Sequence, residues 1–85
     1  MEKIMGPQQT TIYTKRGCPF CTKIKKVYDM KGWKYNELVL DENFTRPQFW
    51  EEFGRSATFP RVIADGKDYG GCNESINEFR KLGWV

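Results

Sequence analysis

The stretch Thr10–Cys21 reads TTIYTKRGCPFC and decides the fold. Its first five residues are all β-branched or aromatic, which is typical of a β-strand. Lys15-Arg16-Gly17 is expected to turn the chain. Pro19 then stands where a helix would begin, because proline at the first helical position gives up a donor that has no partner there. The sequence therefore places two cysteines at the start of a helix that directly follows a strand.

Downstream of this stretch, helical spacing continues through a Lys-rich segment. Ile24, Val27, Tyr28 and Lys31 recur on one face, and Gly32 ends the helix. A second strand is expected over Trp33–Leu40, which finishes in an apolar run.

The next segment predicts a second helix. Thr45 is a candidate N-cap, Pro47 falls in the first turn and Gly54 ends the helix. The apolar face of this helix would carry Phe49, Trp50 and Phe53.

The last third of the chain predicts a hairpin and a helix. Arg61–Ala64 and Lys67–Tyr69 are the expected strands, and Asp65-Gly66 between them is a strong hairpin signal. The final helix is expected to run from Asn73 or Glu74 to Lys81. Its buried face would carry Ile76, Phe79 and Leu82.

The resulting order is β-α-β-α-β-β-α within a chain of 85 residues. A strand–helix–strand opening implies a parallel pair with a right-handed crossover, and the hairpin adds antiparallel pairing. The expected class is α/β: a four-stranded mixed sheet with three helices covering both faces, in a thioredoxin-like arrangement. The length fits one domain, residues 10–85, preceded by an N-terminal tail, residues 1–9.

The net charge of +3 is too small to imply nucleic-acid binding, but the charge is unevenly distributed. Residues 1–34 hold eight basic and two acidic residues, so this part carries +6 and the remainder carries −3. One interpretation is a solvated, Lys-rich helix face. The other is a positive field around the first two cysteines that stabilises a thiolate and attracts an anionic thiol substrate.

Three cysteines and no histidine limit the possible chemistry. An odd, low cysteine count does not fit a disulfide-stapled secreted scaffold. The lack of histidine excludes Ser-His-Asp and Cys-His catalysis and imidazole metal ligation. No apolar run approaches the roughly 18–20 residues that span a bilayer, and residues 1–9 lack the apolar centre of a secretion signal, so neither membrane insertion nor export is expected.

Cys18-Pro19-Phe20-Cys21 is the motif that carries chemistry. Unpaired N–H groups and the helix dipole favour a thiolate at Cys18, and Lys15 and Arg16 add positive charge. Cys21 lies one turn further on and can attack a mixed disulfide on Cys18. The alternative is a zinc knuckle, for which three cysteines without histidine fall short of the usual four ligands.

Two later motifs are ambiguous when taken alone. In Thr58-Phe59-Pro60, the proline could simply begin a strand, and a cis bond is improbable because only about 5–6% of X-Pro bonds in folded proteins are cis. In Gly70-Gly71-Cys72-Asn73-Glu74, exposed N–H groups at a helix start could hold a carboxylate. The simpler interpretation there is an ordinary turn with Asn73 as N-cap.

Taken together, the three motifs resemble the glutaredoxin signature in order and spacing, from Thr10 to Leu82. The resemblance is to the short dithiol glutaredoxins. It implies that Cys18 is the nucleophile, Cys21 the resolving thiol and Pro60 a cis-proline. The thioredoxin motif W-C-G-P-C is absent.

The resemblance also implies a glutathione site. The Phe59 backbone would meet the cysteine part of glutathione, and Lys15 and Arg46 would reach its glycine carboxylate. The turn at Gly71-Cys72-Asn73 would take the γ-glutamyl carboxylate. The full expected set is Lys15, Phe20, Arg46, Thr58, Phe59, Pro60, Gly71, Cys72 and Asn73.

Three positions depart from the family pattern. Phe20 stands where the family often has Tyr, Phe59 where it often has Val, and Asn73 where it often has Asp. The last change removes a charge that would meet the glutathione amine.

The function implied is a cytoplasmic, monomeric, glutathione-dependent thiol–disulfide oxidoreductase. It would reduce protein disulfides and glutathione mixed disulfides without a metal, a nucleic acid or a membrane as partner. Ribonucleotide reductase is a common client in the family. The alternative is a carrier of a [2Fe–2S] cluster, against which Pro19 argues, because cluster-binding relatives usually have a small residue there.

Overall fold

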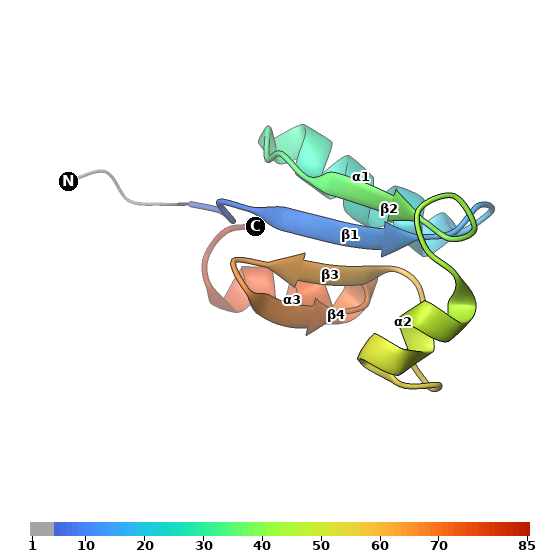
Figure 1. Cartoon of the computed structure of the whole chain (residues 1–85). Coiled ribbons are helices and arrows are strands. Elements are labelled where there is room, and N and C mark those ends of the chain that lie inside the picture. Colours follow the sequence, from blue (N-terminus) through green and yellow to red (C-terminus); the bar gives the residue numbers. More distant parts are fainter. Residues whose placement is uncertain (1–4) are drawn as a thin grey trace.

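The computed structural model describes residues 5–85, and residues 1–4 of the expected tail lie outside the described part. The order β-α-β-α-β-β-α is confirmed (Figure 1). The strands are β1 (Thr10–Thr14), β2 (Asn36–Val39), β3 (Arg61–Ala64) and β4 (Lys67–Gly70). The helices are α1 (Pro19–Lys31), α2 (Arg46–Phe53) and α3 (Cys72–Lys81).

The four strands form one mixed sheet in the order β2-β1-β3-β4. β1 pairs in parallel with β2 and antiparallel with β3, and β3 pairs antiparallel with β4. The hairpin at Asp65-Gly66 is confirmed. Both residues have positive φ, 52° and 79°, as the favoured two-residue turn requires.

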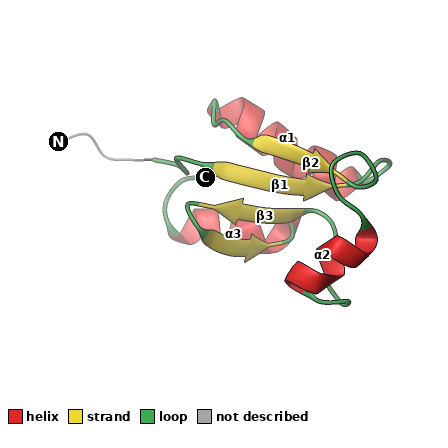
Figure 2. Cartoon of the chain, in the orientation of Figure 1, coloured by secondary structure: helices red, strands yellow, loops and turns green. Residues whose placement is uncertain are grey.

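In Figure 2, α1 and α3 lie behind the sheet, and α2 lies to the side, past the end of β1, so that the near face of the sheet is largely uncovered by helices. Alternate β1 residues explain the division, since side chains point to opposite faces along a strand. Ile12 is buried in the core cluster with Tyr28 of α1 and Phe79 of α3, so those two helices share one face. The Tyr13 ring points the other way and contacts Phe49 of α2 at 5.7 Å between ring centroids. The end of β1, and with it the loop to α1, is therefore held from both sides.

The structure shortens the second strand from the expected Trp33–Leu40 to Asn36–Val39. Trp33 belongs instead to the end of α1, where its backbone N–H donates to the Tyr28 carbonyl at 2.9 Å. Gly32 is left-handed with φ 71°, as a helix C-cap favours. The indole of Trp33 then packs edge-on against Tyr28 and Phe79, so an apolar run that resembles a strand is partly a helix cap.

The last helix begins at Cys72, not at Asn73 or Glu74, and Gly71 is its N-cap. Its buried face was also partly mispredicted. Phe79 is fully buried, but Leu82 is the C-cap and 49% exposed. Trp84 packs on Phe79 instead, with 5.5 Å between ring centroids.

Residues 5–9, assigned from sequence to a tail, lie against the domain. A Cβ on Gly6 would overlap the Trp33 indole, and Gly6 and Pro7 are buried. The backbone N–H groups of Gln8 and Gln9 donate to the Asp65 carboxylate at 2.9–3.2 Å. This clamp fastens the start of the chain to the β3–β4 hairpin.

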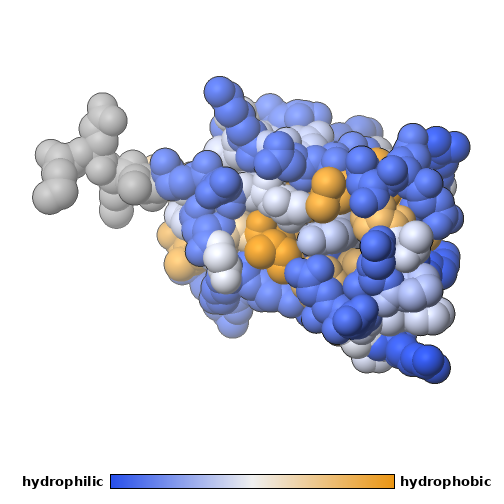
Figure 3. Space-filling model, in the orientation of Figure 1, coloured by the Kyte–Doolittle hydropathy of each residue, from blue (hydrophilic) through white to orange (hydrophobic). Residues whose placement is uncertain are grey.

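Figure 3 shows the molecule from the side on which the sheet lies in front of α1 and α3, with small apolar areas scattered among polar side chains. Within residues 5–85, no helix is both long enough and apolar enough to cross a membrane.

Candidate active site

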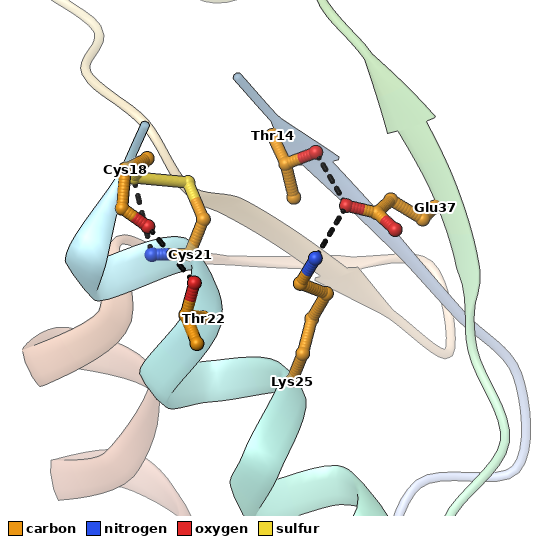
Figure 4. The surroundings of a disulfide bond; sticks show 6 residues. All are labelled: Thr14, Cys18, Cys21, Thr22, Lys25 and Glu37. Atoms are coloured by element: carbon orange, nitrogen blue, oxygen red, sulfur yellow. Dashed lines mark hydrogen bonds and ion pairs between the residues drawn. A yellow bond between two sulfur atoms is a disulfide. The ribbon is translucent and has the colours of Figure 1, made fainter. Parts of the chain in front are cut away.

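Cys18 and Cys21 are joined by a disulfide at the start of α1 (Figure 4). Cys18 is the N-cap, and its Sγ accepts a hydrogen bond from the backbone N–H of Cys21 at 3.1 Å. The two side chains are 7% and 2% exposed. The Cys18 sulfur thus occupies the position where an N-cap oxygen normally satisfies an unpaired helix donor.

The electrostatic surroundings of Cys18 favour a negative sulfur. The first turn of α1 contains no acidic residue, so nothing there offsets the positive end of the helix dipole. Lys15 and Arg16 line the same cleft of about 490 Å³ as the two cysteines. This arrangement can support a thiolate at Cys18, the species that attacks disulfides.

The Phe59–Pro60 peptide bond is cis, as the family resemblance implies and against the base rate for X-Pro bonds. Pro60 is buried directly before β3. Its carbonyl oxygen would lie 3.7 Å from a Cβ built on Gly71, so the second and third sequence motifs adjoin in space.

The Phe59 side chain belongs to an aromatic cluster that anchors α2. Its ring stacks on Phe49, with centroids 4.4 Å apart and planes at 20°, and lies 6.0 Å from Phe44. Lys15 Nζ lies 5.9 Å from the Phe59 ring centroid, which joins the first motif to the second. Phe59, at a position where the family often has Val, thus packs against α2.

Lys15 and Arg46 line one depression of about 320 Å³, as their expected common role requires. Asp41 and Glu42 also line it, and Glu42 pairs with Arg16 at 2.9 Å. The depression is therefore of mixed charge, and an incoming carboxylate would meet three cations, Lys15, Arg16 and Arg46, and two anions.

The third motif forms the N-terminus of α3. Gly71 has no side chain to cap the helix, and Cys72 behind it is 3% exposed in the core. Burial raises the pKa of the Cys72 thiol, which makes it a poor nucleophile at neutral pH. The sulfur of Cys72 is turned into the protein while the helix start remains available through its backbone.

Glu74 ends the third motif, but the sequence analysis gave it no role in the site. A Cβ on Gly71 would lie 2.8 Å from Glu74 Oε2, so this carboxylate lies over the Gly70-Gly71 turn. A glutamate in the first turn after a Gly-Gly pair is the signal that could have identified it. Its negative charge follows directly after the exposed Asn73, the position that lacks the Asp often found in the family.

Two further residues expected at the glutathione site, Phe20 and Thr58, lie at the solvent-exposed edge of the site. Phe20 is 52% exposed next to Cys18, and Thr58 is exposed ahead of the cis bond.

The sequence analysis also missed the group Thr14, Lys25 and Glu37, which lines the cleft beside the disulfide. Lys25 follows Cys21 by four residues on the same helix, and this spacing could have indicated that the two side chains share one face. Within residues 5–85, no cluster of three or more Cys, Asp or Glu side chains could hold a metal ion.

Comparison with known proteins agrees with this geometry. The family model described as Glutaredoxin matches residues 10–69. Glutaredoxin 3 of Escherichia coli K12 is 36% identical over 64 residues, covering 74% of this chain and 76% of that protein. The hybrid peroxiredoxin hyPrx5 of Haemophilus influenzae is 35% identical over 79 residues, and the match spans 87% of this chain but only 32% of that longer protein.

Solved structures of glutaredoxins also superpose on this chain. Glutaredoxin 1 from Francisella tularensis, complexed with cacodylate, superposes with a TM-score of 0.72 at 26% identity, over 88% of this chain and 96% of that one. A buckwheat glutaredoxin–glutathione complex gives 0.75 at 26% identity, over 89% and 72%. The fold and its cysteine pair define a small thiol–disulfide oxidoreductase of the thioredoxin-like class. Within that class, the chain belongs to the glutaredoxin family.

Proposed function

We propose that this protein uses glutathione to reduce protein disulfides and glutathione mixed disulfides. The observation that carries the proposal is the Cys18–Cys21 disulfide at a helix start, with a backbone N–H donated to Cys18 Sγ. Such a sulfur leaves readily and attacks readily, because the same donors that hold it stabilise its anion.

Reduction of a glutathione mixed disulfide takes two successive thiol–disulfide exchanges. The Cys18 thiolate attacks a glutathione mixed disulfide, forming a Cys18–glutathione disulfide and releasing the client as a thiolate, which takes a proton from water. A second glutathione thiolate attacks the glutathione sulfur on Cys18, releasing Cys18 and forming glutathione disulfide. With a protein disulfide, the Cys18 thiolate attacks one client sulfur and releases the other as a thiolate. Cys21 then attacks Cys18 Sγ and releases the second client thiolate, and two glutathiones reduce the Cys18–Cys21 disulfide while forming glutathione disulfide.

The glutathione site proposed here follows the three adjoining motifs. Lys15 and Arg46 take the glycine carboxylate, and the Phe59 backbone beside Pro60 pairs with the cysteine part. The Gly71–Asn73 helix start takes the γ-glutamyl carboxylate. Support comes from the contacts that link Lys15 to Phe59 and Pro60 to Gly71, and from the buckwheat relative described as a glutathione complex.

Glu74 completes this site in the proposal. Its carboxylate lies beside Gly71 and can meet the α-amine of the γ-glutamyl group. Phe20 and Thr58 form the exposed margin. The protein is proposed to act in the cytoplasm as a monomer, and a client such as ribonucleotide reductase stays a prediction.

The decisive experiment compares Cys18→Ser with Cys21→Ser in glutathione-coupled reduction of a small mixed disulfide and of a protein disulfide. Cys18→Ser should lose both activities. Cys21→Ser should keep the first and lose much of the second, since an intramolecular thiol acts at a higher effective concentration than free glutathione. Equal, complete loss in both mutants with the mixed disulfide would replace this mechanism with a strictly dithiol exchange.

A further inference from the structure

A three-residue polar group lies beside the disulfide and is not used by the mechanism above. One oxygen of Glu37, Oε2, accepts a hydrogen bond from Thr14 Oγ1 at 2.7 Å and from Lys25 Nζ at 2.9 Å (Figure 4). The three side chains come from β1, α1 and β2, so the group ties the active-site helix to both parallel strands.

Both cysteines share a cleft with this group, and Figure 4 draws the Cys21 side chain between Cys18 and the group. Cys21, Lys25, Thr14 and Glu37 line one cleft, and Lys25 stands one helical turn after Cys21. Cys21 is 2% exposed, so water screens its sulfur poorly from nearby charge. The protonation of Cys21 therefore depends on which charges the cleft holds and where they stand.

Charged side chains from several segments of the chain line the cleft around Cys21. Lys15 and Arg16 come from the loop before α1, Lys25 from α1, Glu37 from β2 and Glu42 from the loop after β2. Arg16 and Glu42 pair with each other, with side chains 79% and 48% exposed, so solvent weakens their field. The Lys25–Glu37 pair is 29% and 30% exposed and is the better shielded of the two.

We propose that Glu37 is a positioning residue that holds the Lys25 ammonium against the sheet and thereby keeps Cys21 a thiol while Cys18 is a thiolate. The negative carboxylate disfavours a second anion in the cleft, and the ammonium it holds cannot turn toward the Cys21 sulfur. This inference rests on the proposed division of roles between the two cysteines.

The consequence concerns the fate of the Cys18–glutathione mixed disulfide. For Cys21 to resolve it, the Cys21 thiol must first lose its proton to water. The thiolate then bonds to Cys18 Sγ, the Cys18–glutathione bond breaks, and glutathione leaves as a thiolate that takes up a proton. A protonated Cys21 slows this internal step and leaves the mixed disulfide open to a second glutathione. The ion pair would thus favour removal of glutathione from clients over formation of the internal disulfide.

The test uses the full chain with Cys18→Ser and Cys72→Ser, in which Cys21 is the remaining thiol. The rate of its alkylation by iodoacetamide, followed by mass spectrometry against pH, gives the Cys21 pKa. Glu37→Gln should lower this pKa and Lys25→Met should raise it, each by roughly 0.5, because a unit charge acts across a partly solvated cleft. Near neutral pH, the alkylation rates should therefore change about threefold in opposite directions, and 1 M salt should shrink the difference.

Lys26→Met is the matched control, since Lys26 lies on the same helix at an exposed position outside the cleft lining. It should leave the Cys21 pKa unchanged. Circular dichroism identifies any variant that fails to fold, and Lys25→Met and Glu37→Gln serve as independent arms.

Shifts of the same sign in both variants, or no shift in either folded variant, would overturn the proposal. Slower alkylation in Glu37→Gln at an unchanged pKa would also overturn it, because the substitution would then alter access to the Cys21 sulfur and not its charge. Because alkylation consumes no glutathione, failure of the glutathione-coupled assay would count against the proposed function and leave this readout intact.

Discussion

Two of the three cysteines meet opposite environments, although both stand at helix starts. Cys18 caps α1 through its sulfur, whereas Cys72 begins α3 with its sulfur in the core. A helix dipole acts on a thiol only when the sulfur lies near the free N–H groups, so position along the chain does not by itself decide reactivity.

Cys18 in the reduced protein should alkylate with a pKa well below that of a free thiol, about 8.5. The causes are the Cys21 N–H at 3.1 Å and the positive start of α1. Iodoacetamide labelling against pH, with Cys21→Ser and Cys72→Ser in place, measures this value. A free-thiol pKa would contradict the electrostatic account.

Cys72→Ser should keep most of the activity on glutathione mixed disulfides, because the buried sulfur has a raised pKa and takes no part in the exchange. Brief alkylation of the reduced wild-type protein at pH 7 should likewise spare Cys72, as peptide mass spectrometry can show. If Cys72→Ser were as inactive as Cys18→Ser, the assignment would be wrong.

At this scale the sequence predicted the cysteine pair and the cis-proline well, the first from physics and the second from resemblance. Lys25 and Glu37 were missed as a pair because their contact joins separate elements, whereas Glu74 lies beside Gly71, three residues away, and could have been found from the local sequence. Glu37 pairs with a lysine 12 residues away, and a strand glutamate carries no local mark of such a partner.

At the scale of elements, the loop before α1 and the start of α2 bring Lys15 and Arg46 to one depression. Lys15→Glu should raise the KM for glutathione about fivefold, roughly 1 kcal/mol, by reversing charge at the glycine carboxylate. The effect should diminish at high salt. Lys34→Glu, the same change at an exposed residue on the far cleft with Gln8 and Trp33, should leave the KM unaltered.

The capping box of α2 offers a test of how that helix is held. Thr45 Oγ1 accepts from the Gln48 N–H at 3.4 Å, and Gln48 Oε1 accepts from the Thr45 N–H at 2.8 Å. Thr45→Ala should cost about 1 kcal/mol of unfolding free energy, or about 4–8 °C in Tm for a domain of this size. Thr45→Ser keeps the hydroxyl and should cost less than half as much by thermal denaturation.

Elements with strong local signals were predicted accurately. The bounds of α1 follow from Pro19 and Gly32, and those of β3 from the Asp65-Gly66 turn. The errors at β2 and α3 have a shared cause. Trp33 and Trp84 both pack on Phe79, so Trp33 joins the cap of α1 instead of β2, and Trp84 fills the place expected for Leu82 against α3.

At the scale of the whole molecule, the core contains an ionisable group whose titration should affect folding. Tyr28 is fully buried, and burial raises its pKa from 10.0 to about 12, while the hydrogen bond with Thr10 acts the other way. Below pH 10 the tyrosine is protonated in both folded and unfolded chains. Between pH 10 and 12 the unfolded chain ionises first, so stability is lost as the pH rises.

Denaturant unfolding of the oxidised protein should therefore show a free energy that falls between pH 10 and 12, with Tyr28 contributing on the order of 2 kcal/mol. Tyr28→Phe should begin about 1 kcal/mol less stable at pH 7, because the Thr10 hydroxyl loses its partner. Its decline above pH 10 should be shallower than that of the wild type. Parallel declines in the two proteins would show that other groups cause the alkaline loss.

The Asp65 clamp and the contact between Trp84 and Trp33 have a consequence for joining this domain to others. They gather the segment 5–9 and the C-terminal residues at one end of the sheet, while α1 begins, with its dithiol, at the other (Figure 1). A second polypeptide fused through a linker at either end would then leave the cleft beside the dithiol unobstructed. This arrangement suits a domain that can be joined to different larger proteins, because the end that carries the dithiol lies away from both points of attachment.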